Sequence, residues 1–102
     1  MNVTVEREPT HFQVNIDGTI KSVSDSQSIK DAVMSCSDPK LPVRMHIANS
    51  FSVTSSVIGF LLKKVQADKM DLHITVADER LFDLFKSLNL ADILNVHKGI
   101  NA

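Results

Sequence analysis

Two hydrophobic periods alternate along this chain, and their alternation limits its possible folds more than any other feature. Stretches in which every second residue is apolar, the pattern of a half-buried strand, occupy residues 3–16, 43–48 and 72–77. Stretches with apolar residues three and four positions apart, the pattern of an amphipathic helix, occupy residues 24–37, 54–65 and 78–88. Strands that alternate with single helices favour right-handed crossovers between parallel strands. We therefore expect a small α/β domain with a mostly parallel sheet of about four strands and helices on one face.

Nothing in the sequence divides the chain, so we expect one domain over residues 1–102. The three prolines, Pro9, Pro39 and Pro42, fall between the periodic segments. The 11 basic and 12 acidic residues lack the basic excess typical of proteins that bind nucleic acid or anionic membranes. The longest apolar run, Val57 to Leu62, is too short to span a bilayer, and the first residues lack a signal-peptide core. With a single cysteine and no internal disulfide, the protein is expected in a reducing cytoplasm.

The junction between the middle strand and the second helix carries a family resemblance. Its sequence is Ile47-Ala-Asn-Ser-Phe-Ser-Val-Thr-Ser-Ser-Val-Ile-Gly-Phe-Leu. It resembles STAS domains, the sulfate-transporter and anti-sigma-factor-antagonist family, whose second helix opens with an Asp-Ser-Ser-Gly-Leu-Gly-like run. Here Thr54 stands in the place of the Asp and Val57 in the place of the first Gly. The segment that begins at Ala77 resembles the family's third helix and the turn after it.

The resemblance extends from about Phe12 to Val96 and rests mainly on the order and spacing of the elements. A second departure is Gly18-Thr-Ile-Lys21, where the family's antagonists usually show Gly-Glu-Leu-Asp. The resemblance implies a regulatory binding protein, most concretely an anti-sigma-factor antagonist. Such a protein binds a serine-kinase anti-sigma factor and frees the sigma factor, until phosphorylation by that kinase ends the binding.

The resemblance also identifies a phosphate acceptor. Ser55 matches the family's phosphorylated serine, and Ser56 and Thr54 are the neighbouring alternatives. Two other functions remain open. One is a STAS-domain accessory subunit of a lipid-transport ABC complex, and the other is a constitutive STAS adaptor without phospho-regulation.

The same junction has a chemistry that follows from the expected fold alone. In a parallel α/β sheet, ligands and partners approach the loops after the carboxyl ends of the strands. A helix that begins there presents free N–H groups and the positive end of its dipole. Thr54 is expected to be the N-cap, which puts Ser55 and Ser56 in the first turn, where a hydroxyl tolerates anionic modification. The three residues also fit a plain helix cap with no further role, and both interpretations stay open.

The outward face of the second helix predicts a contact surface. The expected inward stripe consists of Ile58, Leu61, Leu62 and Val65. At about 100° per residue, Phe60 then points outward, with Val57 one turn away and Lys63 and Lys64 beside it. An apolar pair rimmed by lysines fits a docking site for another protein, although an isolated or covered Phe60 is the alternative. The predicted partner-binding residues are Thr54, Ser55, Ser56, Val57, Phe60, Lys63 and Lys64.

Signals for catalysis, cofactors or metals are weak. The sequence lacks glycine-rich phosphate loops and the Gly-x-Ser-x-Gly, His-Glu-x-x-His and Cys-x-x-Cys motifs, so we expect a binding protein without cofactor or metal. His46 and His73 fall on the polar phase of two predicted strands, as surface residues or as a metal-binding pair. Cys36 lies on an apolar stripe, where a small core residue is expected. Asp78-Glu79 opens the third helix, where capping is the simpler role than acid–base chemistry.

Overall fold

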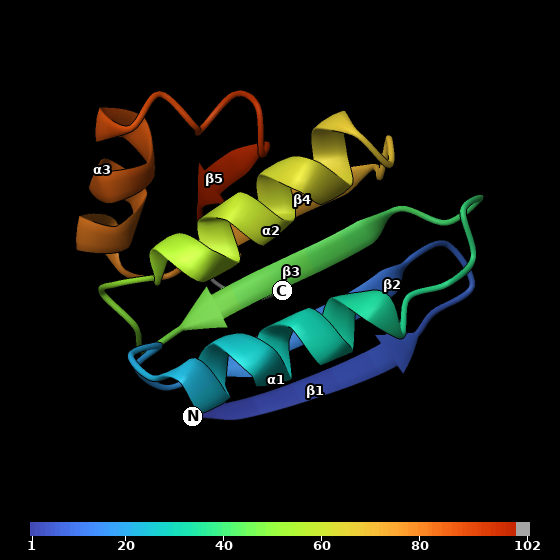
Figure 1. Cartoon of the computed structure of the whole chain (residues 1–102), viewed down its shortest axis with the longest axis horizontal. Coiled ribbons are helices and arrows are strands. Elements are labelled where there is room, and N and C mark those ends of the chain that lie inside the picture. Colours follow the sequence, from blue (N-terminus) through green and yellow to red (C-terminus); the bar gives the residue numbers. More distant parts are fainter. Residues whose placement is uncertain (100–102) are drawn as a thin grey trace.

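A five-stranded sheet with three helices forms the described part of the chain, residues 1–99, in the computed structural model (Figure 1). The strands are β1 (Asn2–Arg7), β2 (Phe12–Asp17), β3 (Val43–Ala48), β4 (Leu72–Val76) and β5 (Val96–Lys98). The helices are α1 (Val23–Met34), α2 (Ser55–Gln66) and α3 (Glu79–Ser87). The strands lie in sequence order; β1 pairs antiparallel with β2, and the other neighbours pair parallel.

The predicted α/β architecture with a mostly parallel sheet is thus confirmed, but the strand number is higher than expected. The additional strand is β5, which has three residues and follows a turn at residues 91–95. A strand of three residues is too short to show a period-two pattern, because that pattern is recognised from alternating apolar and polar residues over a longer segment. Within residues 1–99, no helix has both the length and the apolar character required to cross a membrane.

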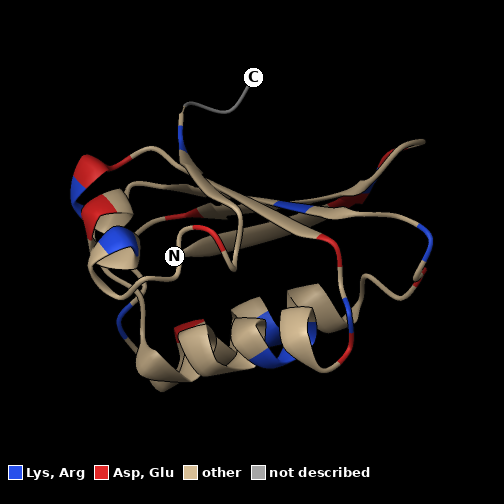
Figure 2. Ribbon diagram, turned by 90° about the horizontal axis from the view of Figure 1, so that it is seen from above, with Lys and Arg blue, Asp and Glu red and all other residues tan. Residues whose placement is uncertain are grey.

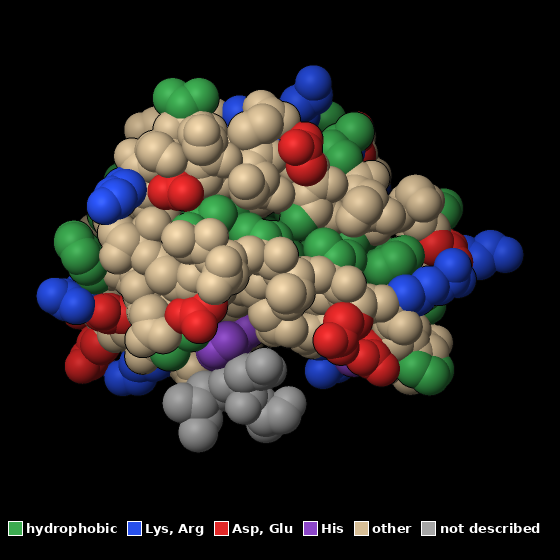
Figure 3. Space-filling view, turned by 90° about the horizontal axis from the view of Figure 1, so that it is seen from below, with side chains coloured by type: hydrophobic (Ala, Val, Ile, Leu, Met, Phe, Trp, Pro, Cys, Tyr) green, Lys and Arg blue, Asp and Glu red, His purple; other side chains and the backbone are tan. Residues whose placement is uncertain are grey.

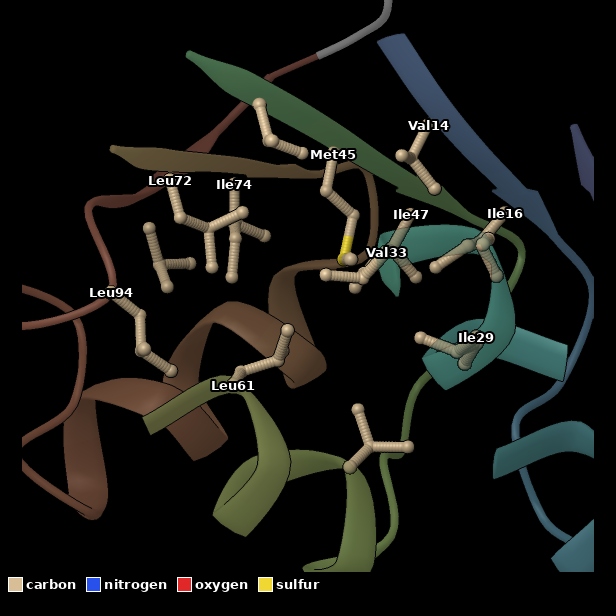
Figure 4. Packing of buried hydrophobic residues seen from close by; sticks show 14 of the residues in the cluster. Val14, Ile16, Ile29, Val33, Met45, Ile47, Leu61, Leu72, Ile74 and Leu94 are labelled. Carbon is tan, nitrogen blue, oxygen red and sulfur yellow. The ribbon is translucent and has the colours of Figure 1, made fainter. Parts of the chain in front are cut away.

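The core lies between the sheet and the helices, which occupy one side of it (Figure 2). Alternate residues of the central strands point toward the helices, and side chains from the helices meet them there (Figure 4). Those that are less than 2 % exposed include Val14, Ile16, Met45, Ile47, Leu72 and Ile74 from the strands and Ile29, Val33, Leu61 and Phe85 from the helices. This packing fixes the directions in which α1 and α2 begin, and the candidate site lies at those two beginnings.

Each helix starts at a polar cap. Ser22 and Asp25 form a capping box on α1, in which Ser22 Oγ accepts from Asp25 N (3.0 Å) and Asp25 Oδ2 accepts from Ser22 N (3.1 Å). Hydrogen bonds from two backbone N–H groups, chiefly that of Lys21 and also that of Ser22, hold the pKa of Asp25 below its ordinary value. Thr54 caps α2 and Asp78 caps α3, as the sequence predicts.

The face of α2 that enters the core differs from the predicted stripe. Leu61 is fully buried as expected, but Val57, predicted to face outward, is 1 % exposed and belongs to the core. The flanking residues are only partly buried and pack against the core from its margin: Ile58, Phe60, Leu62 and Val65. In the helix layer α2 packs against α1 and turns Val57 and Leu61 toward the core (Figure 1). The most deeply buried line therefore runs along Val57 and Leu61, one turn apart.

Candidate functional site

The candidate site lies at the edge of the sheet where the parallel strands β2, β3 and β4 end. The loops of residues 18–22, 49–54 and 77–78 follow these strands and lead into α1, α2 and α3. In Figure 1 this edge is on the left, where the arrowhead of β3 points. The carboxyl edge of a parallel sheet is where such folds bind ligands and partners, because the helix N-termini converge there.

Hydrogen bonds join two of these loops. The buried Ser50 accepts from Ile20 N through its Oγ (3.1 Å) and donates to Ser52 O (2.8 Å), and Ser52 Oγ donates to Ile20 O (3.1 Å). Asn49 adopts a left-handed backbone (φ 60°), which asparagine tolerates, and its Nδ2 donates to Asp17 Oδ1 (2.7 Å). The start of α2 is thereby held in place by the loop that leads to α1.

Thr54 uses its hydroxyl twice. Its Oγ1 accepts from Val57 N (3.2 Å) as the N-cap of α2 and lies 2.7 Å from Ser26 Oγ on α1. Ser26 is buried, and its own hydroxyl reaches Ser22 O (3.1 Å), which leaves Thr54 to donate to Ser26. Thr54 is therefore a structural link between the two helix starts, and its hydroxyl is engaged on both sides.

The two serines that follow differ from each other. Ser56 Oγ accepts a hydrogen bond from Lys30 Nζ of α1 at 2.5 Å. Ser55 is also exposed, but within residues 1–99 its side chain makes no hydrogen bond. Of the three hydroxyls at the start of α2, that of Ser55 alone is both exposed and without a partner among the described residues.

A hollow of about 180 Å³ lies between the N-termini of α1 and α2. Its lining includes hydroxyl groups and two lysines: Lys21, Ser22, Val23, Ser26, Gln27, Lys30, Thr54 and Ser56. The lysines and the two helix dipoles give this region a positive potential. An anion bound in this hollow, beside Thr54 and Ser56, would therefore meet favourable charge; Ser55 is not among the lining residues.

Two exposed apolar side chains that the sequence analysis did not single out belong to the same edge. Val23, at the start of α1, is 87 % exposed, and Phe51, in the loop before α2, is 51 % exposed. The guanidinium of Arg80 lies over the Phe51 ring, 4.9 Å from its centroid, and binds Asp78 Oδ2 at 2.7 Å. Hydrogen bonds from Arg80, chiefly from its side chain and also from its backbone N–H, lower the pKa of Asp78. In the sequence, the only sign of the exposed Phe51 is an aromatic residue within the serine-rich run Asn49-Ser-Phe-Ser.

The outward patch predicted on α2 is wrong in part. Val57 lies in the core and is inaccessible to a partner, because the helix face is turned as described above. Phe60 is half-buried, with Lys64 Nζ 5.8 Å from its ring centroid, and Lys64 also pairs with Asp68 (3.2 Å). Lys63 is exposed. The exposed apolar residues at this edge of the sheet are instead Val23 and Phe51.

The other candidates from the sequence have ordinary structural surroundings. His46 is buried on the sheet face away from the helices, with Nδ1 2.7 Å from Thr75 Oγ1, and His73 Nε2 pairs with Asp71 Oδ1 at 2.8 Å. Among residues 1–99, no three His, Cys, Asp or Glu side chains come close enough together to hold a metal ion. Cys36 is buried, and this burial raises the pKa of its thiol.

Comparison with known proteins adds no assignment. No protein-family model matches the chain, and no curated protein matches it. The sequence motif and the geometry at the start of α2 are therefore the evidence for function.

Proposed function

We propose that this protein is a cytoplasmic, STAS-like regulatory protein of the anti-sigma-factor-antagonist type. It binds an anti-sigma factor that is also a serine kinase, and phosphorylation of Ser55 by that kinase ends the binding. In this role the protein is a substrate and a binding partner, not a catalyst. The proposal combines the resemblance of the Thr54-Ser-Ser segment to the family's motif with the geometry of that segment.

The observation that carries the proposal is the state of the Ser55 hydroxyl. A kinase needs an accessible hydroxyl that gives up no stabilising hydrogen bond when it is modified. Thr54 holds α2 to α1 through Ser26, and Ser56 is held by Lys30. Ser55 is exposed in the first turn, and its side chain makes no hydrogen bond to residues 1–99. The geometry thus favours the same serine that the family resemblance indicates.

The surroundings of Ser55 supply what a protein interface needs. Phe51 is an exposed aromatic residue held under Arg80, and aromatic and arginine side chains contribute much of the affinity of protein interfaces. Val23 adds apolar area from α1. Phe51 and Val23 replace Val57 as the apolar residues of the proposed contact surface, which retains Ser55, Ser56 and Lys63.

A phosphate on Ser55 would affect the complex rather than the fold. It adds about 1.5 to 2 negative charges at a helix N-terminus, where free N–H groups and the dipole tolerate an anion. In the complex, the same dianion must be desolvated against a surface that fits a neutral hydroxyl. The modified domain therefore stays folded while its affinity for the partner falls.

The test compares wild-type protein with Ser55→Ala and Ser55→Asp in capture from host lysate, with and without ATP. Mass spectrometry identifies the captured kinase and the modified residue. Ser55→Ala is expected to bind and to accept no phosphate, and Ser55→Asp to bind at least about tenfold more weakly. Phe51→Ala is expected to weaken binding without lowering the melting temperature. Ser37→Asp is the matched control, because Ser37 is also exposed but lies after α1, beside Val43 and Asp71 at the amino ends of β3 and β4.

The possible results separate the proposal from its alternatives. Phosphate on Ser56 or Thr54 would move the acceptor within the same switch. Absence of phosphate together with full binding by Ser55→Asp would contradict the switch and favour a constitutive STAS adaptor. Co-purification with a membrane-associated transport ATPase, again without serine modification, would favour the accessory subunit of a lipid-transport ABC complex.

A further inference from the structure

β1 is an edge strand whose outward hydrogen-bonding groups can be identified. Glu8 N donates to His11 O at 2.8 Å, in the same register that pairs β1 with β2. In an antiparallel ladder, hydrogen-bonded pairs occur at every second position, so Thr4 and Glu6 bond to β2. The backbone N–H and C=O groups of Val3 and Val5 therefore point away from β2. No strand of the described chain lies beyond β1.

The side chains of β1 add an apolar groove beside this edge. Val3 and Val5 lie on the helix-facing side of the sheet, in register with Ile16 and Val14, and Val5 is 37 % exposed. A groove of about 430 Å³ between β1 and α1 is lined by Met1, Val3, Val5, Ser28, Asp31 and Ala32. Figure 3 views the molecule from the β1 side and shows hydrophobic side chains in a band across the middle of this face.

β1 lacks most of the features that usually prevent edge strands from pairing. Such features are short length, lysines, prolines and bulges. β5, at the other edge, has only three residues and ends at Lys98. β1 has six residues, pairs with β2 in unbroken register and contains neither lysine nor proline; its two charged residues, Glu6 and Arg7, stand at its C-terminal end.

We propose that β1 pairs antiparallel with β1 of a second copy of this chain, about a two-fold axis at Thr4. Val3 then lies opposite Val5 of the second copy, and Asn2 lies opposite Glu6. Because the outward backbone groups belong to Val3 and Val5, each Val3–Val5 pair exchanges two hydrogen bonds. The two five-stranded sheets become one continuous sheet.

A second copy is the occupant because the strand is complementary to itself in this register. A two-fold axis perpendicular to the sheet keeps both sets of helices on the same side, so the four valines meet next to both grooves. On the other side, the Asn2 amide faces the Glu6 carboxylate, so the carboxylates of the two copies are not opposed. A register centred on Val5 would place Val3 opposite Arg7 instead.

The antiparallel arrangement also keeps the two proposed switch surfaces apart. Rotation about the axis at Thr4 reverses the direction of the parallel strands in the second copy. The carboxyl edges, each with its Ser55, therefore lie at opposite ends of the joined sheet. The dimer would present two independent surfaces to two partner molecules.

The first test measures the mass of the intact protein by light scattering over a concentration series up to about 1 mM, the range of weak association. The mass is expected to rise from 11.3 kDa toward twice that value. Val5→Pro leaves the β1–β2 bonds intact but removes an outward N–H, and Val5→Lys adds an edge charge. Each is expected to raise the dissociation constant at least about tenfold.

Ile93→Lys is the matched control, since Ile93 is 41 % exposed and lies in the turn before β5, the strand at the opposite edge of the sheet from β1, and it is expected to leave the dimer unchanged. Circular dichroism and thermal unfolding verify that each variant is folded. A wild-type chain that stays monomeric at every concentration overturns the proposal. A dimer that survives both Val5 substitutions also overturns it, because another surface must then be responsible.

The second test examines the register. Opposite Cα atoms at a non-hydrogen-bonded pair lie about 4.5 Å apart, within disulfide range. Thr4→Cys should therefore form a disulfide-linked dimer under mild oxidation. Glu6→Cys should not, because Glu6 faces Asn2 rather than itself, and the wild type controls for the buried Cys36. Equal cross-linking of Thr4→Cys and Glu6→Cys, or none of Thr4→Cys, would rule out this pairing.

Discussion

Two leucines adjacent in α2 provide a direct test of how that helix packs. The sequence predicts that both belong to the inward stripe, but Leu61 is fully buried whereas Leu62 is only partly buried at the margin of the core. The same substitution, Leu→Ala, at the two positions changes helix propensity by the same amount. A difference in the free energy of unfolding between the variants therefore reports the difference in packing.

The expected magnitudes follow from burial. Truncation of Leu61 removes Cγ and both Cδ atoms from the core, at about 0.8 kcal/mol for each buried carbon, and leaves a cavity. Because the sheet and α1 hold the surrounding side chains in place, the total for Leu61→Ala is expected at about 3 kcal/mol, within the known range of about 2 to 5. Leu62→Ala removes the same atoms from a partly solvated position, so about 1 kcal/mol is expected.

The assay is urea unfolding of both variants beside the wild type, followed by circular dichroism. Unchanged slopes would show that the substitutions act on the folded state, so that the midpoints give the energies. The measurements should be made at one protein concentration, because dimerisation would add to the apparent stability. A loss for Leu62→Ala as large as that for Leu61→Ala would refute the packing of α2 described here and restore the stripe expected from the sequence.

Two further outcomes are expected. Thr54→Val should lower the free energy of unfolding by about 1 to 2 kcal/mol, because the α2 cap and the link to Ser26 are lost. Thr54→Asp should retain most of the cap. Equal losses for the two variants in thermal melts would contradict this role of the Thr54 hydroxyl. Burial lowers the pKa of His46, so the unfolded chain binds more protons there than the folded chain as pH falls below the ordinary value of 6.5. Stability should therefore decline from pH 6.5 toward lower pH, and a His46→Gln variant with the same decline would show that other groups cause it.

The order of elements could be predicted because burial on one side leaves a period in the sequence. β2 and β4 alternate cleanly, since the sheet has a buried side toward the helices and a polar side away from them. The caps at Thr54 and Asp78 were also predictable, because they depend on local hydrogen bonds within a few residues. These features are local, and local features are the ones that a single sequence records.

The helix face and the exposed residues of the site depend on contacts that are distant in sequence. Whether Val57 or Ile58 points inward depends on how α2 packs on the core and against α1. Phe51 is exposed because its loop is tied to Ile20 through Ser50 and Ser52, some thirty positions away. The hydrogen bonds that distinguish Ser55 from Thr54 and Ser56 likewise come from α1. No periodicity within α2 could have shown them.

α1 takes part in both proposed surfaces, and its packing determines whether they influence each other. Ser26 and Lys30 face the start of α2, whereas Ser28, Asp31 and Ala32 line the groove beside β1. The two sets share no residue and are joined at the surface by the exposed hydrogen bond from Gln27 to Asp31.

Between the two sets, Ile29 and Val33 are fully buried, so α1 is held against the sheet as a rigid body. An effect of one surface on the other requires an element with two alternative positions. Because α1 is fixed by its core residues, a phosphate on Ser55 should leave the β1 pairing unchanged, and a dimer should bind its two partners independently.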